Sequence, residues 1–237
     1  MKLLLLSNST NHGSGYLDHA MEAVLAWLGA ERRIAFVPFA LHDQAGYVAK
    51  VAERFGREGV AVQGVTADAA GAALVDATEV VFVGGGNTFR LLDRLHRSGL
   101  LDAIARRVRA GMPYMGASAG TNVAAPTIRT TNDMPIVEPP SFSALCLVPF
   151  QINPHYLDPD PASTHMGETR EQRLLEFLEE NDVPVVGLRE GTWLAVQDGG
   201  LRLEGAAAGA RVFRRGAPPE DVGAGSALDR LLAPSRG

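Results

Sequence analysis

The chain has 237 residues, with 22 Lys and Arg against 27 Asp and Glu, which gives a formal net charge of −5. This balance argues against a basic nucleic-acid-binding protein, and a single cysteine argues against a disulfide-stapled secreted module. The N-terminal apolar run Leu3 to Leu6 is far shorter than the about 20 residues of a membrane-spanning helix. We therefore expect a globular cytoplasmic protein that binds neither nucleic acid nor membrane, with Cys146 in a reducing compartment.

Short apolar runs alternate with helical patterns along most of the chain, which is typical of a mostly parallel sheet sandwiched by helices. The predicted strands are Lys2–Leu6, Ile34–Phe39, Val60–Val65, Val80–Val83, Pro113–Gly116, Leu145–Ile152 and Val183–Leu188. The predicted helices are Tyr16–Leu28, Gln44–Arg57, Thr88–Arg97, Leu101–Arg109, Arg170–Glu180 and Ala227–Leu232. These elements together predict an α/β fold.

After Gly191 the pattern changes to short strands separated by turn residues. Thr192–Val196, Leu201–Leu203 and Arg211–Phe213 predict a short antiparallel meander at the edge of the sheet. No internal repeat or long linker divides the chain, so we expect one catalytic domain over residues 1–237, with the Gly/Pro-rich tail 214–237 peripheral.

A candidate nucleophile lies in Gly116-Ala117-Ser118-Ala119-Gly120, directly after a predicted strand. The pattern is that of a nucleophile elbow, in which small neighbours let the chain turn sharply and expose the serine hydroxyl above the sheet. The following helix would direct its positive end at this hydroxyl, and the Ala119 amide would donate to a developing oxyanion. A chance turn of small residues is the alternative.

A serine nucleophile needs a base, and the chain has six histidines. His155 follows an apolar strand in Asn153-Pro154-His155, which places it where α/β proteins assemble their sites, at the carboxyl edge of the sheet. His165 is the rival. An ordinary loop histidine is the alternative for either residue.

Two carboxylates are candidates to orient the histidine. Glu190 ends a predicted strand at the same edge as His155, whereas Asp133 lies in the loop Thr131-Asn132-Asp133-Met134-Pro135. Asp133 would otherwise form a turn with its own backbone, and Glu190 would otherwise pair with Arg189 at the surface.

The Gly-rich turn Gly84-Gly85-Gly86-Asn87 follows a very apolar strand. It is not a dinucleotide-binding fingerprint, because Phe89 stands where a third small residue is needed. We expect the Gly86 amide to complete an oxyanion hole with Ala119, unless the turn serves only to begin the next helix. No pattern suggests a metal site or a cofactor.

Arg170 lies at the predicted start of a helix, where the macrodipole disfavours a cation. A guanidinium in this place suggests an anion to be bound, such as a substrate carboxylate. A surface ion pair with Glu168 or Glu171 is the local alternative.

Six motifs in this order and spacing resemble the peptidase E (α-aspartyl dipeptidase) family. They are Val83-Gly84-Gly85-Gly86-Asn87-Thr88, Gly116-Ala117-Ser118-Ala119-Gly120, Thr131-Asn132-Asp133-Met134-Pro135-Ile136, Ile152-Asn153-Pro154-His155, Gly167-Glu168-Thr169-Arg170 and Leu188-Arg189-Glu190-Gly191. The resemblance extends from the N-terminal strand to about Gly205. It implies a class-I glutamine-amidotransferase-like fold and a serine exopeptidase, without a cofactor, that releases aspartate from Asp-Xaa dipeptides.

Carried over by motif, the resemblance makes Ser118 the nucleophile, His155 the general base, Gly86 and Ala119 the oxyanion donors, and Arg170 the group that recognises the aspartyl side chain. It offers both Asp133 and Glu190 as the third triad member. We favour Glu190, because a residue that ends a strand is held more rigidly than one in a Pro-containing loop.

The alternatives are a cyanophycinase-like hydrolase of aspartyl-linked polymer and a non-catalytic carboxylate-binding module. A monomer or a homodimer is expected, and the sequence does not decide between them.

Overall fold

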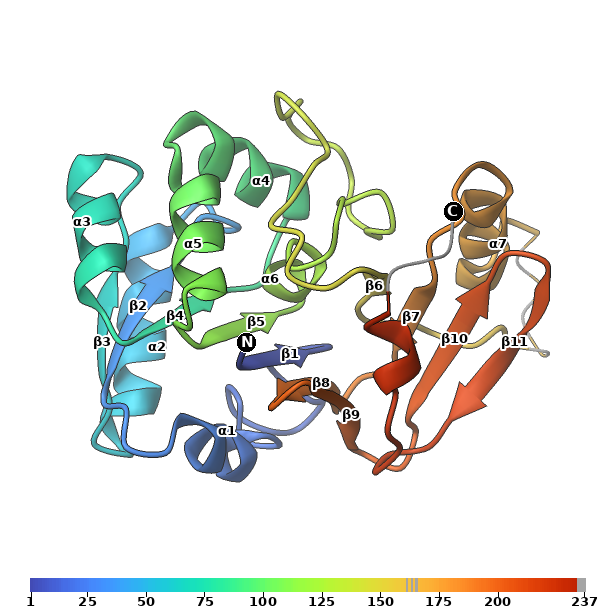
Figure 1. The fold of residues 1–237 in the computed structure, drawn as a ribbon, viewed down its shortest axis with the longest axis horizontal. Helices are drawn as coiled ribbons and strands as arrows, with labels where there is room; N and C mark the ends of the chain where they lie inside the picture. The colour runs from blue at the N-terminus through green and yellow to red at the C-terminus, as the bar shows by residue number, and fades with distance from the viewer. Residues whose placement is uncertain (161, 163, 165, 234–237) are drawn as a thin grey trace.

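The computed structural model describes residues 1–160, 162, 164 and 166–233. Its larger sheet has the strand order β3-β2-β4-β5-β1-β8-β9 (Figure 1). The first five strands of this order pair in parallel, and β8 and β9 add an antiparallel edge. The bounds are β1 Leu3–Leu6, β2 Arg33–Val37, β3 Ala61–Gly64, β4 Val80–Val83, β5 Tyr114–Ala117, β8 Thr192–Gln197 and β9 Gly200–Gly205.

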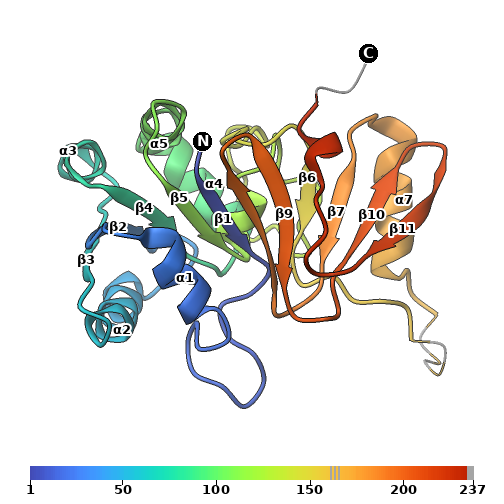
Figure 2. The same cartoon turned by 60° about the horizontal axis from the view of Figure 1, so that its bottom comes forward.

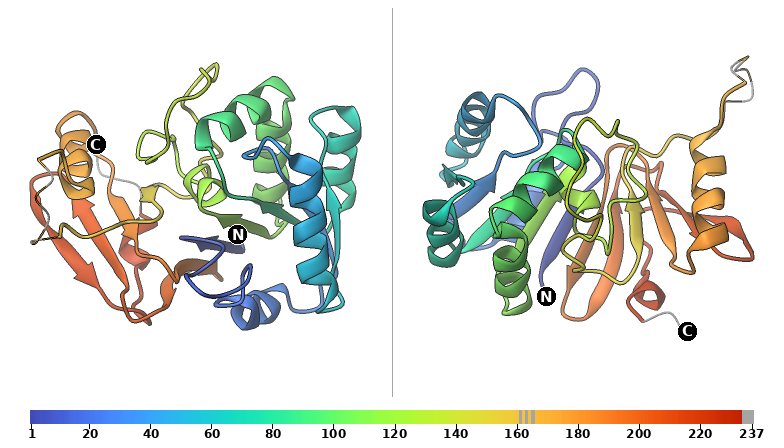
Figure 3. Two further views of the ribbon diagram at one scale, coloured as in Figure 1. Left: turned by 180° about the vertical axis from the view of Figure 1, so that it is seen from behind. Right: turned by 90° about the horizontal axis from the view of Figure 1, so that it is seen from above.

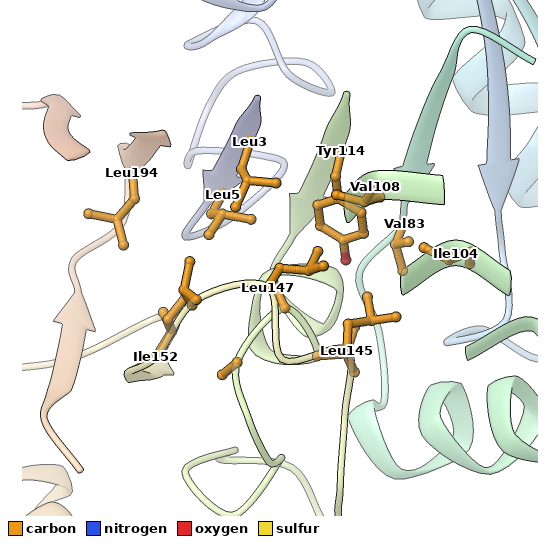
Figure 4. Packing of buried hydrophobic residues seen from close by; sticks show 14 of the residues in the cluster. Leu3, Leu5, Val83, Ile104, Val108, Tyr114, Leu145, Leu147, Ile152 and Leu194 are labelled. Carbon is orange, nitrogen blue, oxygen red and sulfur yellow. The ribbon is translucent and has the colours of Figure 1, made fainter. Parts of the chain in front are cut away.

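Helices cover both faces of this sheet, as the alternation of the side chains of β1 shows. Leu4 and Leu6 pack in a cluster with residues of α1 (Met21–Leu28) and α2 (Gln44–Gly56). Leu3 and Leu5 point the other way, into the largest core cluster, to which α4 and α5 also contribute (Figure 4). The bounds on that face are α3 Ala69–Ala77, α4 Thr88–Arg97 and α5 Leu100–Arg109. A strand buried on both faces reads as a continuous apolar run, which is why Leu3–Leu6 has no polar residue.

A smaller sheet of order β11-β10-β7-β6 lies beside the larger one (Figures 1 and 2). Its strands are β6 Gln151–Asn153, β7 Val185–Leu188, β10 Ala210–Arg214 and β11 Ala217–Val222. Helix α7 (Arg170–Glu180) covers one face (Figure 3), where its buried residues Leu174 and Leu178 cluster with a phenylalanine of β10. The other face belongs to the largest core cluster, so both sheets share one apolar interior.

The α/β class is confirmed, while several predicted elements are wrong in detail. Leu145–Ile152 is not one strand: Leu145 and Leu147 donate to the backbone carbonyls of Val123 and Ala124, and only Gln151–Asn153 joins a ladder. The apolar run is buried because it covers the chain that follows the elbow, so its hydrophobicity reflects burial and not strand pairing (Figure 4).

The predicted meander is also divided between the sheets. β8 and β9 extend the larger sheet, whereas β10 pairs with β7 and β11 in the smaller one. The tail from residue 214, expected to be peripheral, supplies β11 as an edge strand, and its Leu228 and Leu231 are buried in the main core.

Three helices differ from the predictions. Helix α1 begins only at Met21, because Leu17 has a left-handed φ of 60° and the chain turns there. Ala227–Leu232 reduces to a 3₁₀ turn, Asp229–Leu231, and helix α3 was missed. The α3 sequence is rich in Ala and Gly, so its apolar face gives a weak periodic signal.

Candidate active site

Ser118 stands at a sharp turn between β5 and the four-residue helix α6 (Ala119–Asn122). Its φ is 54°, a left-handed conformation that is costly for a serine. The flanking glycines make the turn possible: a Cβ on Gly116 would lie 2.5 Å from the Gly120 carbonyl oxygen, and one on Gly120 would lie 2.0 Å from that of Val83. The structure therefore has the strand-turn-helix geometry predicted for an elbow.

His155 links Ser118 to a carboxylate. Its Nε2 lies 2.9 Å from Ser118 Oγ, and its Nδ1 lies 2.7 Å from Glu190 Oε1. With Nδ1 protonated and donating to Glu190, Nε2 is left to accept the proton of the serine hydroxyl. The His155 ring is about one-third exposed and Glu190 about one-half, so this hydrogen-bonded chain borders solvent.

Asp133, the other predicted carboxylate, lies elsewhere in the same region. Its Oδ2 accepts hydrogen bonds from the backbone N–H of Thr88 at 2.7 Å and from the Thr88 hydroxyl at 2.6 Å. This carboxylate therefore accepts from the first N–H of α4, the helix whose N-cap is Asn87. Of the two candidates, the structure places Glu190, and not Asp133, on His155.

Two backbone N–H groups in the cavities that Ser118 lines have no acceptor among the described residues. The N–H of Ala119 begins α6, and the N–H of Gly86 follows the Gly-rich turn. The N–H of neighbouring Gly85 is already used, since it donates to the Tyr47 hydroxyl at 3.0 Å. Gly86 has a φ of 132°, which favours glycine. Because α6 has only four residues, its macrodipole contributes less than the sequence suggested, and the individual N–H groups of Ala119 and Gly86 are left as candidate oxyanion donors.

A cavity of about 310 Å³ opens beside this serine and histidine. Among its lining residues are one cation, Arg170, and two carboxylates, Asp133 and Glu190. Asn122 also lines it; this side chain is buried, and its Oδ1 has no hydrogen-bond partner in the described part of the chain. A small polar molecule with charges of both signs would find partners here.

Arg170 is the first residue of α7, behind a capping box formed by Thr169 and Gln172. Its guanidinium donates to the carbonyl oxygen of His155. Burial is the main cause that lowers its pKa, although arginine stays charged. The surface pairing considered from sequence does not occur within the described residues, because Glu168 pairs with Arg173 and Glu171 with Arg211.

The comparison with protein families decides the family. Residues 3–204 match the model of peptidase family S51. The protein belongs to peptidase family S51. This match and the relatives described next confirm the resemblance to the peptidase E family inferred from the six motifs, and the class of a serine peptidase.

Similar proteins cover from 82% to 98% of this S51 chain. It is 60% identical to a "Peptidase E" of Streptomyces coelicolor over 232 residues, which are 98% of this chain and 95% of that one. It is 50% identical to a "Probable alpha-aspartyl dipeptidase" of Drosophila melanogaster over 198 residues, 82% of each chain.

Solved structures support the fold. A peptidase from an acI-B1 Actinobacterium superposes with a TM-score of 0.70 at 17% identity over 96% of each chain. A putative peptidase E from Listeria monocytogenes gives a TM-score of 0.65 at 21% identity, over 86% of this chain and 98% of that one.

The sequence did not reveal which residues hold the S51 histidine in place. His155 has a left-handed φ of 54°, and its backbone N–H donates to the hydroxyl of buried Ser7 at 2.9 Å. Ser7 in turn donates to the Leu188 carbonyl at 2.9 Å. The next residue, Asn8, accepts from the N–H of Gly191, which follows Glu190. The only available signal in the sequence was that two polar residues, Ser7 and Asn8, directly follow the apolar run Leu3–Leu6.

Other predictions concern a rival base, a metal site and a membrane-spanning helix. His165, the rival base, lies outside the described residues. Among the residues described, no group of three or more His, Cys, Asp or Glu side chains is arranged to hold a metal ion. In the same part of the chain, no helix has the length and apolar character needed to cross a membrane.

Proposed function

We propose that this S51 protein is an α-aspartyl dipeptidase in which Ser118, His155 and Glu190 form the catalytic triad. The observation that carries the proposal is the continuous hydrogen-bonded chain from Ser118 Oγ through the His155 ring to Glu190, beside a cavity that contains Arg170. Relatives named peptidase E and α-aspartyl dipeptidase at 60% and 50% identity support the choice of substrate.

The geometry supports acyl transfer through a covalent intermediate. His155 Nε2 takes the proton of Ser118 while Oγ attacks the aspartyl carbonyl carbon, and the amides of Ala119 and Gly86 stabilise the oxyanion. His155 then gives that proton to the departing amino group, which breaks the peptide bond and leaves an aspartyl ester on Ser118. Water, deprotonated by His155, then attacks the ester carbonyl carbon. The bond from that carbon to Ser118 Oγ breaks, His155 returns the proton to Oγ, and aspartate is released from the free serine. Glu190 keeps the tautomer of His155 and stabilises its imidazolium.

Arg170 recognises the aspartyl side chain in this proposal. Its guanidinium is half-buried, has no carboxylate partner among the described residues, and lines the cavity beside Ser118. A partly desolvated cation gains from an anionic ligand, and a fork of donors fits a carboxylate. Glu-Xaa dipeptides place that carboxylate one methylene too far along, so we expect poor turnover of Glu-Leu.

Asp133 and Asn122 provide partners for the free α-ammonium of the substrate. Asp133 Oδ1 has no hydrogen-bond partner among the described residues, and the buried Asn122 Oδ1 also lacks one. Both residues line the cavity that contains Arg170. This assignment explains why Asp133, which does not contact His155, still belongs to the site. Binding of the free α-ammonium also restricts hydrolysis to the bond after the N-terminal residue.

Incubating the purified protein with Asp-Leu, Glu-Leu, N-acetyl-Asp-Leu and an aspartyl-linked polymer tests the proposal. Release of leucine from Asp-Leu alone is the expected result. Release from the polymer would favour a cyanophycinase-like hydrolase, and binding of aspartate without any hydrolysis would favour a carboxylate-binding module. Either result would overturn the proposal.

Variants separate the roles of the two carboxylates. Glu190→Gln should lower kcat, because it weakens stabilisation of the imidazolium, whereas Asp133→Asn should mainly raise KM. Asp102→Asn, at an exposed site on α5, is the matched control and should change neither constant. A loss of kcat confined to Asp133→Asn would show that Asp133 completes the triad.

Three further predictions belong to this proposal. They are that residues 1–237 form a single catalytic domain, that the protein acts in the cytoplasm, and that it is a monomer or a homodimer.

A further inference from the structure

A second cavity also reaches Ser118 and His155. It measures about 480 Å³ and shares these two residues with the first cavity. Gly85 and Gly86 form part of its wall, so the candidate oxyanion donor Gly86 lines this second cavity. A peptide attacked at its carbonyl carbon by Ser118 must place its acyl half in one cavity and its leaving half in the other. Arg170 and Asp133 line only the first, which leaves the second for the leaving amino acid.

The lysine and the carboxylate that line this second cavity are Lys50 and Asp43. The Asp43 carboxylate accepts from the N–H of Gly46 at 2.9 Å and caps the N-terminus of α2, which compensates part of its charge. The Lys50 ammonium lies 4.9 Å from the centre of the Tyr16 ring and has no carboxylate partner among the described residues. Lys50 is thus the cation of this cavity that is free to bind an anion.

Helix α2 connects this cation to the catalytic turn. Lys50 and Tyr47 are three residues apart, so they lie on the same face of α2. The buried Tyr47 hydroxyl accepts from the Gly85 N–H at 3.0 Å and lies 3.3 Å from the Tyr16 hydroxyl. Lys50 is therefore presented by a helix that is anchored to the wall of the oxyanion site, and not by a loose surface segment.

The leaving half of a dipeptide always carries a carboxylate, because its second residue is also its C-terminus. We infer that Lys50 binds this C-terminal carboxylate and thereby selects dipeptides over longer or C-terminally blocked peptides. The inference rests on the proposed function and assigns the second cavity to it. In a longer peptide the same position holds a neutral amide, which offers Lys50 no charge.

Comparison of Asp-Leu with Asp-Leu-amide tests the inference, since the two substrates differ only in the charge at the C-terminus. For the wild type we expect kcat/KM to be about tenfold higher for the free acid, as for one partly exposed charge-assisted hydrogen bond. Lys50→Met should reduce this ratio to about one, and Lys50→Arg should retain most of it. Circular dichroism of each variant establishes that the fold is kept.

Lys2→Met is the matched control. Lys2 is the only other lysine of the chain, and its ammonium lies 5.3 Å from the centre of the Trp27 ring, outside both cavities. The ratio of kcat/KM for Asp-Leu to kcat/KM for Asp-Leu-amide should be the same in Lys2→Met as in the wild type. If wild type cleaves Asp-Leu but a folded Lys50→Met keeps the full preference for the free acid, the inference is wrong while the proposed function stands. If wild type cleaves neither substrate, the proposed function itself fails.

Discussion

Replacing Ser7 by alanine tests how the fold positions the catalytic histidine. The Ser7 hydroxyl accepts from the His155 N–H and donates to the Leu188 carbonyl, both at 2.9 Å. The Leu188 carbonyl keeps a second partner in Ser7→Ala, because it also accepts from the N–H of Tyr156. The His155 N–H keeps none among the described residues, and a part-buried donor without a partner costs about 1–3 kcal/mol.

This cost has two measurable consequences. For a chain of this length the midpoint Tm of thermal unfolding should fall by about 2 to 12 °C. His155 also holds a left-handed backbone conformation, so loss of its anchor should displace the ring from Ser118 and lower kcat for Asp-Leu by about 10- to 100-fold, with KM little changed.

Thermal unfolding followed by circular dichroism and steady-state kinetics on Asp-Leu measure the two effects. Ser14→Ala is the matched control, because it removes an exposed hydroxyl that also bonds to a carbonyl, that of Asn11. An unchanged kcat in Ser7→Ala would refute the positioning role, even if Tm fell.

Three further predictions concern the elbow, the substrate cation and acid stability. Gly120→Ala places a Cβ 2.0 Å from the Val83 carbonyl oxygen and should lower the free energy of unfolding by about 3 kcal/mol. Gly56→Ala, whose Cβ meets nothing within 4 Å beyond its chain neighbours and the backbone of its own helix, should not lower this free energy in urea denaturation. Arg170→Met should lower kcat/KM for Asp-Leu by about 100-fold and abolish its preference over Asn-Leu; a retained preference would contradict the assignment. Burial lowers the pKa of His19 from 6.5, so the unfolded chain binds its proton more readily, and stability is lost as pH falls below that value. The urea midpoint should therefore drop less between about pH 7.5 and about pH 5.5 in His19→Gln than in wild type; equal drops would contradict this.

The main parallel strands could be predicted because burial on both faces gives unbroken apolar runs, such as Val80–Val83, which the structure reproduces. An unbroken apolar run also predicted a strand at Leu145–Phe150, and this prediction is wrong. A segment that covers the chain after α6 is just as apolar as a strand. The placement of β10 beside β7 depends on long-range pairing, which no local pattern records.

The site was predictable where chemistry imposes a local pattern. The elbow needs small residues around Ser118, and His155 and Glu190 each follow a strand, so the motifs mark them directly. Ser7 and Lys50 carry no such mark, because each is one ordinary residue brought to the site by β1 and α2. Their relation to Ser118 is visible only when the elements are placed in space.

The turnover of Asp-Leu by Ser118→Ala tests the central claim most directly. If Ser118 attacks the aspartyl carbonyl, kcat should fall by about 10⁴-fold or more. The alanine should leave the fold intact, because both neighbours in the elbow are already alanine. The wild type and the folded variant are compared by the release of leucine under identical conditions. Near-complete loss of turnover is the predicted result, and hydrolysis by Ser118→Ala at the wild-type rate would contradict the account.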